Sequence, residues 1–404
     1  MIGTRGAAQA ADLTDVRTTN LTVVLRYVRA HAPCSRADIA ASTGLNKATV
    51  SSLVTDLLDR RLLRETGLVA NRIGRPATML TLESRPYAAV GIEVAADHMT
   101  AVAIDLAGER LLSWRRASPL TGPPGKAVAA VAALAGRVVG KVTGQGRQIL
   151  GLTVAVPGLV AADDTVRFAP HVGWPELDLR AQLVKALRRP AYDVAVDNDA
   201  NLAALAEQRD GGYADIPDLI HLLGGVGVGA GIIVDGRPLR GGHGRAGQIG
   251  HLQLDPAGPE CGCGRRGCLD AYVGLPALVR RALPDTGADG PVVDYAPEIE
   301  RIVALAGAGD ATVNAALAEA GRRLGHAVAT LADLLDPRVV LLGGSFVPLA
   351  PWLLPAAEAE VRARVSTPDA CRVAVSTLGA GAAAVGGAAR ALDRVEAGHL
   401  PAVP

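Results

Sequence analysis

A cysteine-rich segment from His251 to Asp270 constrains this chain more than any other part of its sequence. Three of the five cysteines, Cys261, Cys263 and Cys268, fall within eight residues, and His251 stands ten residues before the first of them. Three thiolates and one imidazole form the closed tetrahedral ligand set of a structural zinc site, whereas a catalytic site keeps one position open for water. The intervening glycines allow the sharp turns that bring three sulfurs to one ion. The sequence therefore predicts a structural Zn²⁺ held by His251, Cys261, Cys263 and Cys268.

The alternative for these cysteines is a disulfide or a set of unrelated thiols. The number of cysteines is odd, and the first residues, MIGTRGAAQAADLTD, lack the sustained apolar stretch of a secretory signal. Both observations argue against a disulfide framework and predict a cytoplasmic protein, whose reducing surroundings favour thiolates. The longest apolar stretches, such as residues 219–234, are broken by glycine and too short to cross a bilayer, so no membrane partner is expected.

The charge of the chain is distributed unevenly along its length. The 404 residues allow two or three domains with an ample core, and the net charge is only +1. Residues 1–85, however, carry 12 Lys and Arg against 7 Asp and Glu, whereas the remainder carries 29 against 33. A basic N-terminal part on a slightly acidic body is compatible with binding to nucleic acid.

Residues 20–64 have the pattern of three short helices. Ser35 and Asp38 form a capping-box pattern that starts the second helix, and Gly44 ends it. The third helix, residues 47–59, has apolar side chains at helical spacing on its inner face. Its outer face carries small polar side chains, which can enter a major groove and reach base edges. The residues expected to contact DNA here are Asn46, Lys47, Thr49, Ser51 and Ser52.

Two strand patterns, residues 62–65 and 77–82, follow the third helix and enclose the loop NRIGRPA. Arg72 and Arg75 in this loop can contact phosphate or a narrow minor groove, as the wing of a winged helix does. Residues 20–84 are therefore expected to form a winged helix-turn-helix that binds double-stranded operator DNA. The alternative is a helical cap on an enzyme. Residues 1–19 are expected to be a flexible N-terminus.

From Tyr87 onward, strand and helix patterns alternate. AVGIEVA and MTAVAIDLAG predict adjacent strands, and ILGLTVAVPG and DVAVDNDA predict two more. LIHLLGGVGVGAGIIVDG predicts a strand, a glycine loop and a strand, and a long helix near residues 311–335 precedes the strand RVVLLGG. This order predicts an α/β body of two lobes with a cleft between them over residues 85–393, followed by a tail, residues 394–404.

Four motifs of this body resemble those of the ROK family (repressors, open reading frames, kinases). They are NDAN at 198–201, GVGAGII at 227–233, AGQIGH at 246–251 and CGCGRRGCLD at 261–270. The last two with their spacing are highly specific, whereas a glycine loop alone is a weak signal. The resemblance covers nearly the whole chain from about residue 20. It implies a winged helix joined to a two-lobed, actin-like and sugar-kinase-like (ribonuclease H-like) domain with a zinc loop at residues 247–270.

The resemblance also implies an effector site. In family members that phosphorylate sugars, the aspartate matching Asp199 takes a proton from the attacking hydroxyl, and the asparagine matching Asn198 holds sugar hydroxyls. Helix capping is the alternative role for Asp199. The histidine matching His251 binds zinc with one nitrogen and can offer the other to a sugar hydroxyl. Gln248 and Asp270 stand where the family usually has glutamate, and both keep hydrogen-bonding capacity while charge or reach changes.

The ATP-phosphate loop of the ROK kinases is not matched. Those kinases have an Asp-x-Gly-Gly-Thr turn, and the corresponding residues 93–97 are EVAAD. The side chains of Ala95 and Ala96 obstruct close backbone approach, and Asp97 adds negative charge near a polyphosphate. Val226 stands where kinases commonly have threonine. Because phosphoryl transfer depends on positioning and charge neutralisation, the sequence predicts that the chain is not an enzyme and that Asp199 is a vestigial base.

The chain is therefore expected to be a DNA-binding transcriptional regulator, with repression the favoured direction. A sugar or related small molecule bound in the cleft would move the lobes and respace the winged helices of a homodimer or homotetramer. One alternative is a sugar kinase with an accessory DNA-binding module. Another is a regulator that has lost its effector and responds to a protein partner.

Overall fold

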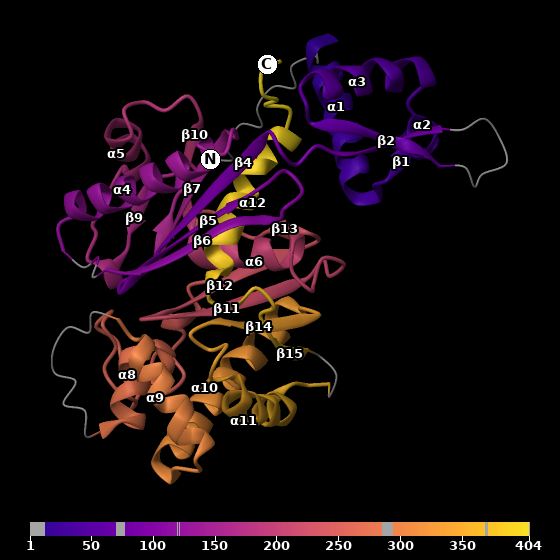
Figure 1. Cartoon of the computed structure of the whole chain (residues 1–404). Coiled ribbons are helices and arrows are strands. Elements are labelled where there is room, and N and C mark those ends of the chain that lie inside the picture. The colour runs from indigo at the N-terminus through magenta and orange to yellow at the C-terminus, as the bar shows by residue number, and fades with distance from the viewer. Residues whose placement is uncertain are drawn as a thin grey trace, which may run out of the picture.

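The computed structural model describes residues 13–69, 77–118, 120, 122–284, 294–367 and 371–403. These residues form a small N-terminal domain and two α/β lobes, with the C-terminal helix running between the lobes and ending beside the N-terminal domain (Figure 1). This architecture confirms the predicted fold class. Arg72 and Arg75 of the expected wing lie outside the described residues. Within the described part of the chain, no helix combines the length and the apolar character needed to cross a membrane.

The N-terminal domain has the predicted winged-helix arrangement of helices and strands. Asp38 N donates to Ser35 Oγ at 3.2 Å while Ser35 N donates to Asp38 Oδ2 at 2.9 Å, so the capping box is formed. Gly44 ends the second helix in a left-handed conformation with φ of 73°. The strands form one antiparallel sheet in the order β1-β3-β2. The elements are α1 (Leu13–His31), β1 (Cys34–Ser35), α2 (Arg36–Thr43), α3 (Lys47–Asp59), β2 (Leu63–Val69) and β3 (Ala77–Leu82).

The flexible N-terminus expected for residues 1–19 is wrong over residues 13–19, because α1 begins at Leu13. Among residues 16–20, Val16 is exposed, and buried apolar side chains follow from Leu21, so apolar spacing gave no sign of this part of the helix. Arg17 here forms an ion pair with α3, in which its Nη2 atom lies 3.0 Å from Asp56 Oδ2. Residues 1–12 lie outside the described residues.

The first lobe is built on a sheet with the strand order β10-β7-β4-β5-β6. β10, β7 and β4 are parallel, and β4, β5 and β6 are antiparallel. Helices α4 and α5 pack on one face, and the other face packs on α12. The elements are β4 (Tyr87–Val94), β5 (His98–Ile104), β6 (Arg110–Ala117), α4 (Pro124–Thr143), β7 (Gln148–Val156), β8 (Leu159–Val160), β9 (Val166–Phe168), the 3₁₀ helix η1 (Pro170–Val172), α5 (Leu179–Ala186) and β10 (Asp193–Asn198).

The second lobe has a sheet with the order β13-β12-β11-β14-β15. One face packs on α8, α10 and α11 in the largest apolar core, and the other face packs on α6. The elements are α6 (Asp199–Arg209), β11 (Leu219–Gly224), β12 (Val228–Val234), β13 (Arg237–Pro238), η2 (Ile249–His251), α7 (Asp270–Val273), α8 (Leu275–Ala282), α9 (Ala296–Gly307), α10 (Ala311–Leu335), β14 (Val339–Gly344), α11 (Ala350–Arg364), β15 (Arg372–Val375), η4 (Gly379–Gly381) and α12 (Ala382–Glu396).

Helices α6 and α12 pack against each other between the two sheets (Figure 1). Glycine makes this close packing possible at two places. A Cβ atom at Gly91 on β4 would lie 1.9 Å from the carbonyl oxygen of Ala384, and one at Gly386 would lie 1.8 Å from that of Leu202. Since no side chain fits at these distances, the two central helices touch their neighbours through bare backbone.

The predicted tail, residues 394–404, is also wrong in part. Helix α12 continues to Glu396, and the described residues after it return to the N-terminal domain. Arg60 Nη1 donates to the carbonyl of Pro401 at 2.6 Å, and Arg26 Nη2 donates to that of Glu396 at 3.1 Å. Arg29 pairs with the Glu396 carboxylate. These long-range contacts leave no periodic signal in the sequence, so the end of the chain looked like a tail.

Candidate functional site

The outer face of α3 is open for contact with DNA. Val50, Leu53, Val54 and Leu57 are buried against the rest of the domain, which fixes the orientation of the helix. Lys47, Ser51 and Ser52 are exposed and Thr49 is half-buried, so the predicted contact residues lie on or beside the outer face.

Two details of this surface differ from the sequence expectation. Asn46 is exposed, but its Oδ1 accepts a hydrogen bond from Thr49 N at 2.8 Å, so the amide oxygen caps the helix and only the amide nitrogen faces outward for other contacts. Arg17 of α1, which sequence reasoning missed, has a side chain that is 49% exposed and an Nη1 atom 3.5 Å from Ser52 Oγ. It adds a basic group beside α3 that a flexible N-terminus would not have placed there.

The predicted metal ligands converge on one point. The ligand atoms of His251, Cys261, Cys263 and Cys268 all lie within 4.8 Å of one another. Cys263 Sγ and Cys268 Sγ are 3.7 Å apart, and Cys261 Sγ is 3.8 Å from His251 Nδ1. Two thiolates on a tetrahedral zinc ion lie about 3.8 Å apart, given Zn–S bonds of about 2.3 Å, whereas a disulfide needs about 2 Å. The donor set therefore fits one tetrahedral metal ion, and all five cysteines are free thiols.

The loop that carries the three cysteines is closed by its own backbone. Leu254 N donates to Gly267 O at 2.8 Å, and Gly267 N donates to Pro259 O at 2.8 Å. Gly267 has φ of 66°, and a Cβ atom there would lie 1.5 Å from Asp255 O. Only glycine allows this crossing, which brings Cys268 back to the other ligands.

Asn198 and Asp199 lie where β10 ends and α6 begins. Asn198 Oδ1 accepts from Asn201 N at 2.9 Å, so Asn198 is the N-cap, and the capping role considered for Asp199 belongs to its neighbour. Asn198 Nδ2 donates to Gly158 O at 2.9 Å and to Asp199 Oδ1 at 3.0 Å. This arrangement fixes the orientation of the Asp199 carboxylate at the edge of the first lobe.

His171, which sequence reasoning missed, crosses from the first lobe to the second. Its Nε2 atom lies 3.5 Å from Asp270 Oδ2. A Cβ atom at Gly227 would lie 2.2 Å from the same nitrogen, so the imidazole fills the space over the second glycine loop. Asp270 Oδ1 in turn accepts from Val228 N at 2.8 Å, and its Oδ2 is 3.9 Å from His251 Nδ1. The imidazole thereby links the first lobe to the metal-binding loop.

A cavity of about 530 Å³ lies between the lobes beside these residues. Gly158, the hydrogen-bond partner of Asn198, and Pro170, the neighbour of His171, line it from the first lobe, and Gln248 and His251 line it from the second. A volume of this size is typical of small-molecule sites. Two of the five expected effector residues, Gln248 and His251, therefore line this cavity. Asn198 is joined to it through Gly158, and Asp270 lies beside His251.

Two carboxylates of the cleft have strongly raised pKa values. Burial raises the pKa of Asp199 to about 7, against the opposing effects of the Ala200 N–H and of His171. Burial also raises the pKa of Glu93 to about 7, with the nearby charge of Asp199 adding to it. Glu93 Oε2 has no hydrogen-bond partner in the described part of the chain. Near neutral pH both groups can therefore carry a proton.

The turn that corresponds to the kinase phosphate loop is engaged in contacts within the protein. Asp97 is 5% exposed, and its Oδ1 lies 2.8 Å from His98 Nδ1. Its Oδ2 accepts from Tyr295 N of the second lobe at 3.2 Å. The sequence suggested that this carboxylate would add negative charge near a nucleotide. The structure shows instead that it is held between the two lobes, beside an ion pair of Arg115 with Asp294.

Known proteins match both parts of the chain. A family model described as the ROK family matches residues 89–394, and one described as the MarR family matches residues 22–69. The xylose repressor of Bacillus subtilis is 27% identical over 385 residues, which are 95% of this chain and 97% of the repressor. A solved ROK family transcriptional regulator, a homologue of the Escherichia coli MLC protein, aligns with a TM-score of 0.80 at 27% identity, over 95% of this chain and 98% of that one.

An enzyme is also among the similar structures. A ROK family glucokinase from Streptomyces griseus, solved with glucose and AMPPNP, aligns with a TM-score of 0.64 at 28% identity. The alignment covers 98% of the kinase but 75% of this chain. The kinase therefore lacks a counterpart for about a quarter of the chain, whereas the regulators match it almost from end to end.

Proposed function

The chain belongs to the ROK family, and from this premise we propose that it is a DNA-binding transcriptional repressor whose operator affinity changes when a sugar or a related small molecule binds between its lobes. One structural observation carries the proposal. Helix α6 begins at Asn198 and Asp199 in the cleft, and the residue that ends it, Asp210, lies 3.2 Å from Arg29 of the DNA-binding domain. A change at the effector site can therefore reach the DNA-binding domain through one rigid element.

Operator binding is assigned to α3 and to the loop that follows β2. Small polar side chains such as Ser51 and Ser52 can approach base edges, and Lys47 at the helix N-terminus can contact phosphate. Arg17 extends this surface on one side. We include Arg72 and Arg75 as wing residues on the basis of the sequence, and a homodimer or homotetramer would present two such surfaces to a palindromic operator. Because its target is the chromosome, we place the protein in the cytoplasm.

We propose that the cleft does not catalyse phosphoryl transfer. A kinase must wrap the ATP phosphates in backbone N–H groups and neutralise their charge. Here Ala95 and Ala96 carry side chains in the first loop, and the adjacent Asp97 is tied to His98 and Tyr295. In the second loop, the imidazole of His171 occupies the space over Gly227. Side chains of the protein therefore occupy the space beside both loops in which a kinase would hold the ATP phosphates.

Zinc is the metal that the donor set fits best. Three sulfurs and one imidazole nitrogen match the ligands of closed structural zinc sites. Bound zinc would fix the ring of His251 through Nδ1, the nitrogen nearest Cys261, and leave Nε2 for a ligand hydroxyl. The metal would therefore act as a structural support for the effector cavity.

A hydroxyl-rich ligand suits the groups around the cavity. Asn198 and Gln248 offer both donors and acceptors, and His251 offers a ring nitrogen. Asp199, whose pKa is raised to about 7, can present a proton to a sugar oxygen and avoid the cost of a buried unpaired charge. Asp270, whose Oδ1 accepts a hydrogen bond from Val228 N, adds a carboxylate beside His251. Arg245 and Arg265 also line the cavity, so a ligand that carries an anionic group beside its hydroxyl groups finds partners there too.

Operator binding titrations with a panel of pentoses, hexoses and amino sugars test the proposal. We expect one sugar to change the operator Kd by about 5- to 150-fold, the range of typical allosteric coupling, and operator DNA to change the Kd of that sugar by the same factor. The same panel incubated with ATP should give no phosphorylated product. Turnover of any of these sugars with ATP would favour the kinase alternative, and a panel without any binding would remove carbohydrate as the effector.

A further inference from the structure

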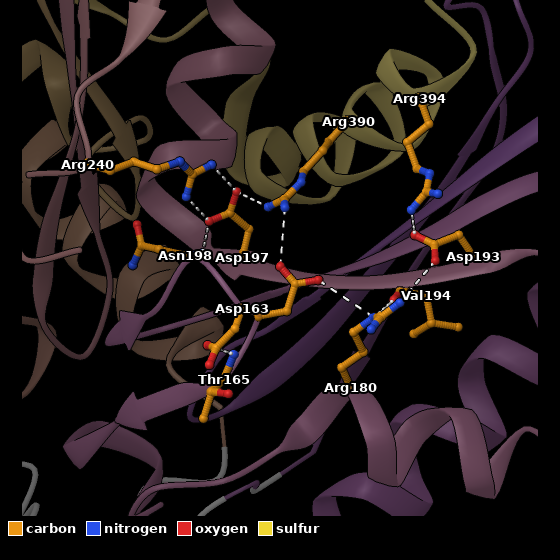
Figure 2. A network of polar contacts seen from close by, with 11 residues as sticks. Asp163, Thr165, Arg180, Asp193, Val194, Asp197, Asn198, Arg240, Arg390 and Arg394 are labelled. Atoms are coloured by element: carbon orange, nitrogen blue, oxygen red, sulfur yellow. Dashed lines mark hydrogen bonds and ion pairs between the residues drawn. The ribbon is translucent and has the colours of Figure 1, made fainter. Parts of the chain in front are cut away.

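A second cavity of about 480 Å³ lies beside α12 and shares no lining residue with the cavity in the cleft. Four arginines line it, and Figure 2 shows them along β10, with Arg240 and Arg390 at Asp197 and Arg180 and Arg394 at Asp193. Arg180 comes from α5 of the first lobe, Arg240 from the segment after β13 of the second lobe, and Arg390 and Arg394 from α12. Side chains from three parts of the molecule therefore meet around one space.

The lining of this cavity holds four arginines and three aspartates, and a fourth aspartate pairs with two of the arginines from behind. Arg240 donates two hydrogen bonds of 2.7 Å to Asp197, which also pairs with Arg390 (Figure 2). Asp197 is only 1% exposed and does not line the cavity, so its charge lies behind the arginines. The groups that do line the cavity are the acids Asp164, Asp193 and Asp393, opposed by Arg180, Arg240, Arg390, Arg394 and the titratable His399.

One buried polar atom beside this cavity has no hydrogen-bond partner. Thr153 on β7 is fully buried and lines the cavity, and its Oγ1 atom is unpaired within the described part of the chain. A buried hydroxyl without a partner is unfavourable. Less than 1 Å² of this atom is accessible, so a ligand oxygen reaches it only when the neighbouring side chains shift.

We propose that this cavity binds a small anion that carries a phosphate or carboxylate group. Guanidinium groups bind such anions through paired N–H donors. Arg180 and Arg394 have side chains that are 46% and 44% exposed and share Asp193 as a partner, so they are the best placed to turn toward an anion. A divalent cation fits this lining less well, because four guanidinium groups, which stay protonated, surround the same space.

Binding of an anion in this cavity would affect the DNA-binding domain. A neighbouring cavity of about 330 Å³ shares Leu205 and Asp393 with it and is lined by Arg29 of α1. Glu396, two residues beyond Arg394 at the end of α12, pairs with Arg29. An anion that contacts the last turns of α12 therefore alters the contact between Glu396 and Arg29 of α1. This site is separate from the proposed effector cleft and does not depend on it.

Calorimetry on the full chain with inorganic phosphate and with glucose 6-phosphate tests the proposal. The variants are the wild type, Arg180→Ala/Arg394→Ala, and Arg167→Ala as a matched control, since Arg167 is 45% exposed and pairs with acids away from the cavity. We expect the double variant to bind at least tenfold more weakly, because two charge-assisted contacts are lost, and the control to bind as the wild type does. A lysine pair, Arg180→Lys/Arg394→Lys, keeps the charge without the fork and should show an intermediate loss even if the alanine pair folds poorly.

A Gln248→Ala variant separates this cavity from the cleft. Anion binding that survives Gln248→Ala and is lost in the arginine variant supports the proposal, whereas the reverse result places the anion in the cleft and overturns it. Absence of binding in the wild type, or equal binding in all variants, also overturns it. Binding of glucose 6-phosphate but not of phosphate identifies a phosphorylated metabolite as the source of the anion. Operator titrations with saturating anion must show a shift in Kd that the arginine variant lacks, or the link to DNA binding is refuted.

Discussion

Arg29 on α1 lies 3.2 Å from Asp210, the residue that caps the C-terminal end of α6. The other end of this 11-residue helix, about 16 Å away, carries Asn198 and Asp199 of the effector cleft. Arg29 also pairs with Glu396 at the end of α12. One arginine of the DNA-binding domain is thus held by the ends of both helices that lie between the lobes, and any rotation of those helices must move it or break its pairs.

The first prediction concerns this arginine. Arg29→Ala should leave operator affinity without effector close to that of the wild type, because Arg29 does not lie on α3. It should reduce the effector-induced change in operator Kd to less than a third of its wild-type value, because the pairs that transmit the movement are lost. Fluorescence anisotropy with and without effector measures both quantities. Arg36→Ala, which removes a pair with Glu65 inside the same domain, is the control. A full effector response in Arg29→Ala would refute this role.

The second prediction concerns the metal. Elemental analysis of the purified protein should give one zinc ion per chain, and Cys263→Ser should lower that content while Cys371→Ser, which lies outside the cluster, should not. Chelation should lower the melting temperature and weaken effector binding, since His251 and Asp270 belong to the same loop. A metal-free protein with an unchanged melting temperature and unchanged effector affinity would show that the cluster is not a metal site.

The third prediction uses the raised pKa of Glu93, about 7 in the folded protein against an ordinary value of 4.5. A carboxyl group whose pKa is raised by folding stabilises the folded state at low pH, and this contribution is lost as the pH rises from about 4.5 through about 7. Glu93→Gln removes that loss. Its free energy of unfolding should equal that of the wild type near pH 4 and exceed it by about 3 kcal/mol at pH 8. Urea unfolding over this pH range is the measurement, with the exposed Glu109→Gln as control. A gain that is the same at both pH values would contradict the assignment.

Local sequence patterns predicted the elements whose signals are local. The helices at residues 47–59 and 311–335 follow from apolar spacing and capping, and the metal ligands follow from residue type and spacing. The start of α1 did not, because the contact that Arg17 makes there is an ion pair with Asp56, 39 residues along the chain, which leaves no apolar spacing. The buried face of a helix can be recognised in a sequence from its apolar spacing, whereas a single long-range ion pair leaves no pattern.

The same reason explains which part of the effector site was missed. Asn198 and Asp199 stand in a recognisable motif, but His171 acquires its role only when the lobes close and place it against Gly227 and Asp270. Its sequence neighbours, Pro170 and Val172, give no sign of this contact. Asp97 was identified as a departure from the kinase pattern, yet its partner Tyr295 lies 198 residues further along the chain. Contacts between lobes depend on the relative position of two separately packed bodies, which local patterns do not encode.

The last prediction tests whether His171 positions the effector site. If its imidazole orients Asp270, then His171→Ala should weaken effector binding by about tenfold, the effect of one lost contact to a charged group. Gly227→Ala should act in the same way, since the new Cβ atom would lie 2.2 Å from His171 Nε2 and displace the ring. Because both changes remove one interaction, the double variant should bind no more weakly than either single variant. Gly225→Ala is the matched control in the same loop, because a Cβ atom there meets its nearest neighbour at 3.6 Å. Calorimetry with the effector identified in the sugar panel gives the four affinities. Additive losses in the double variant would show that His171 and Gly227 act independently. Unchanged binding in His171→Ala would show that His171 does not contribute to the effector site.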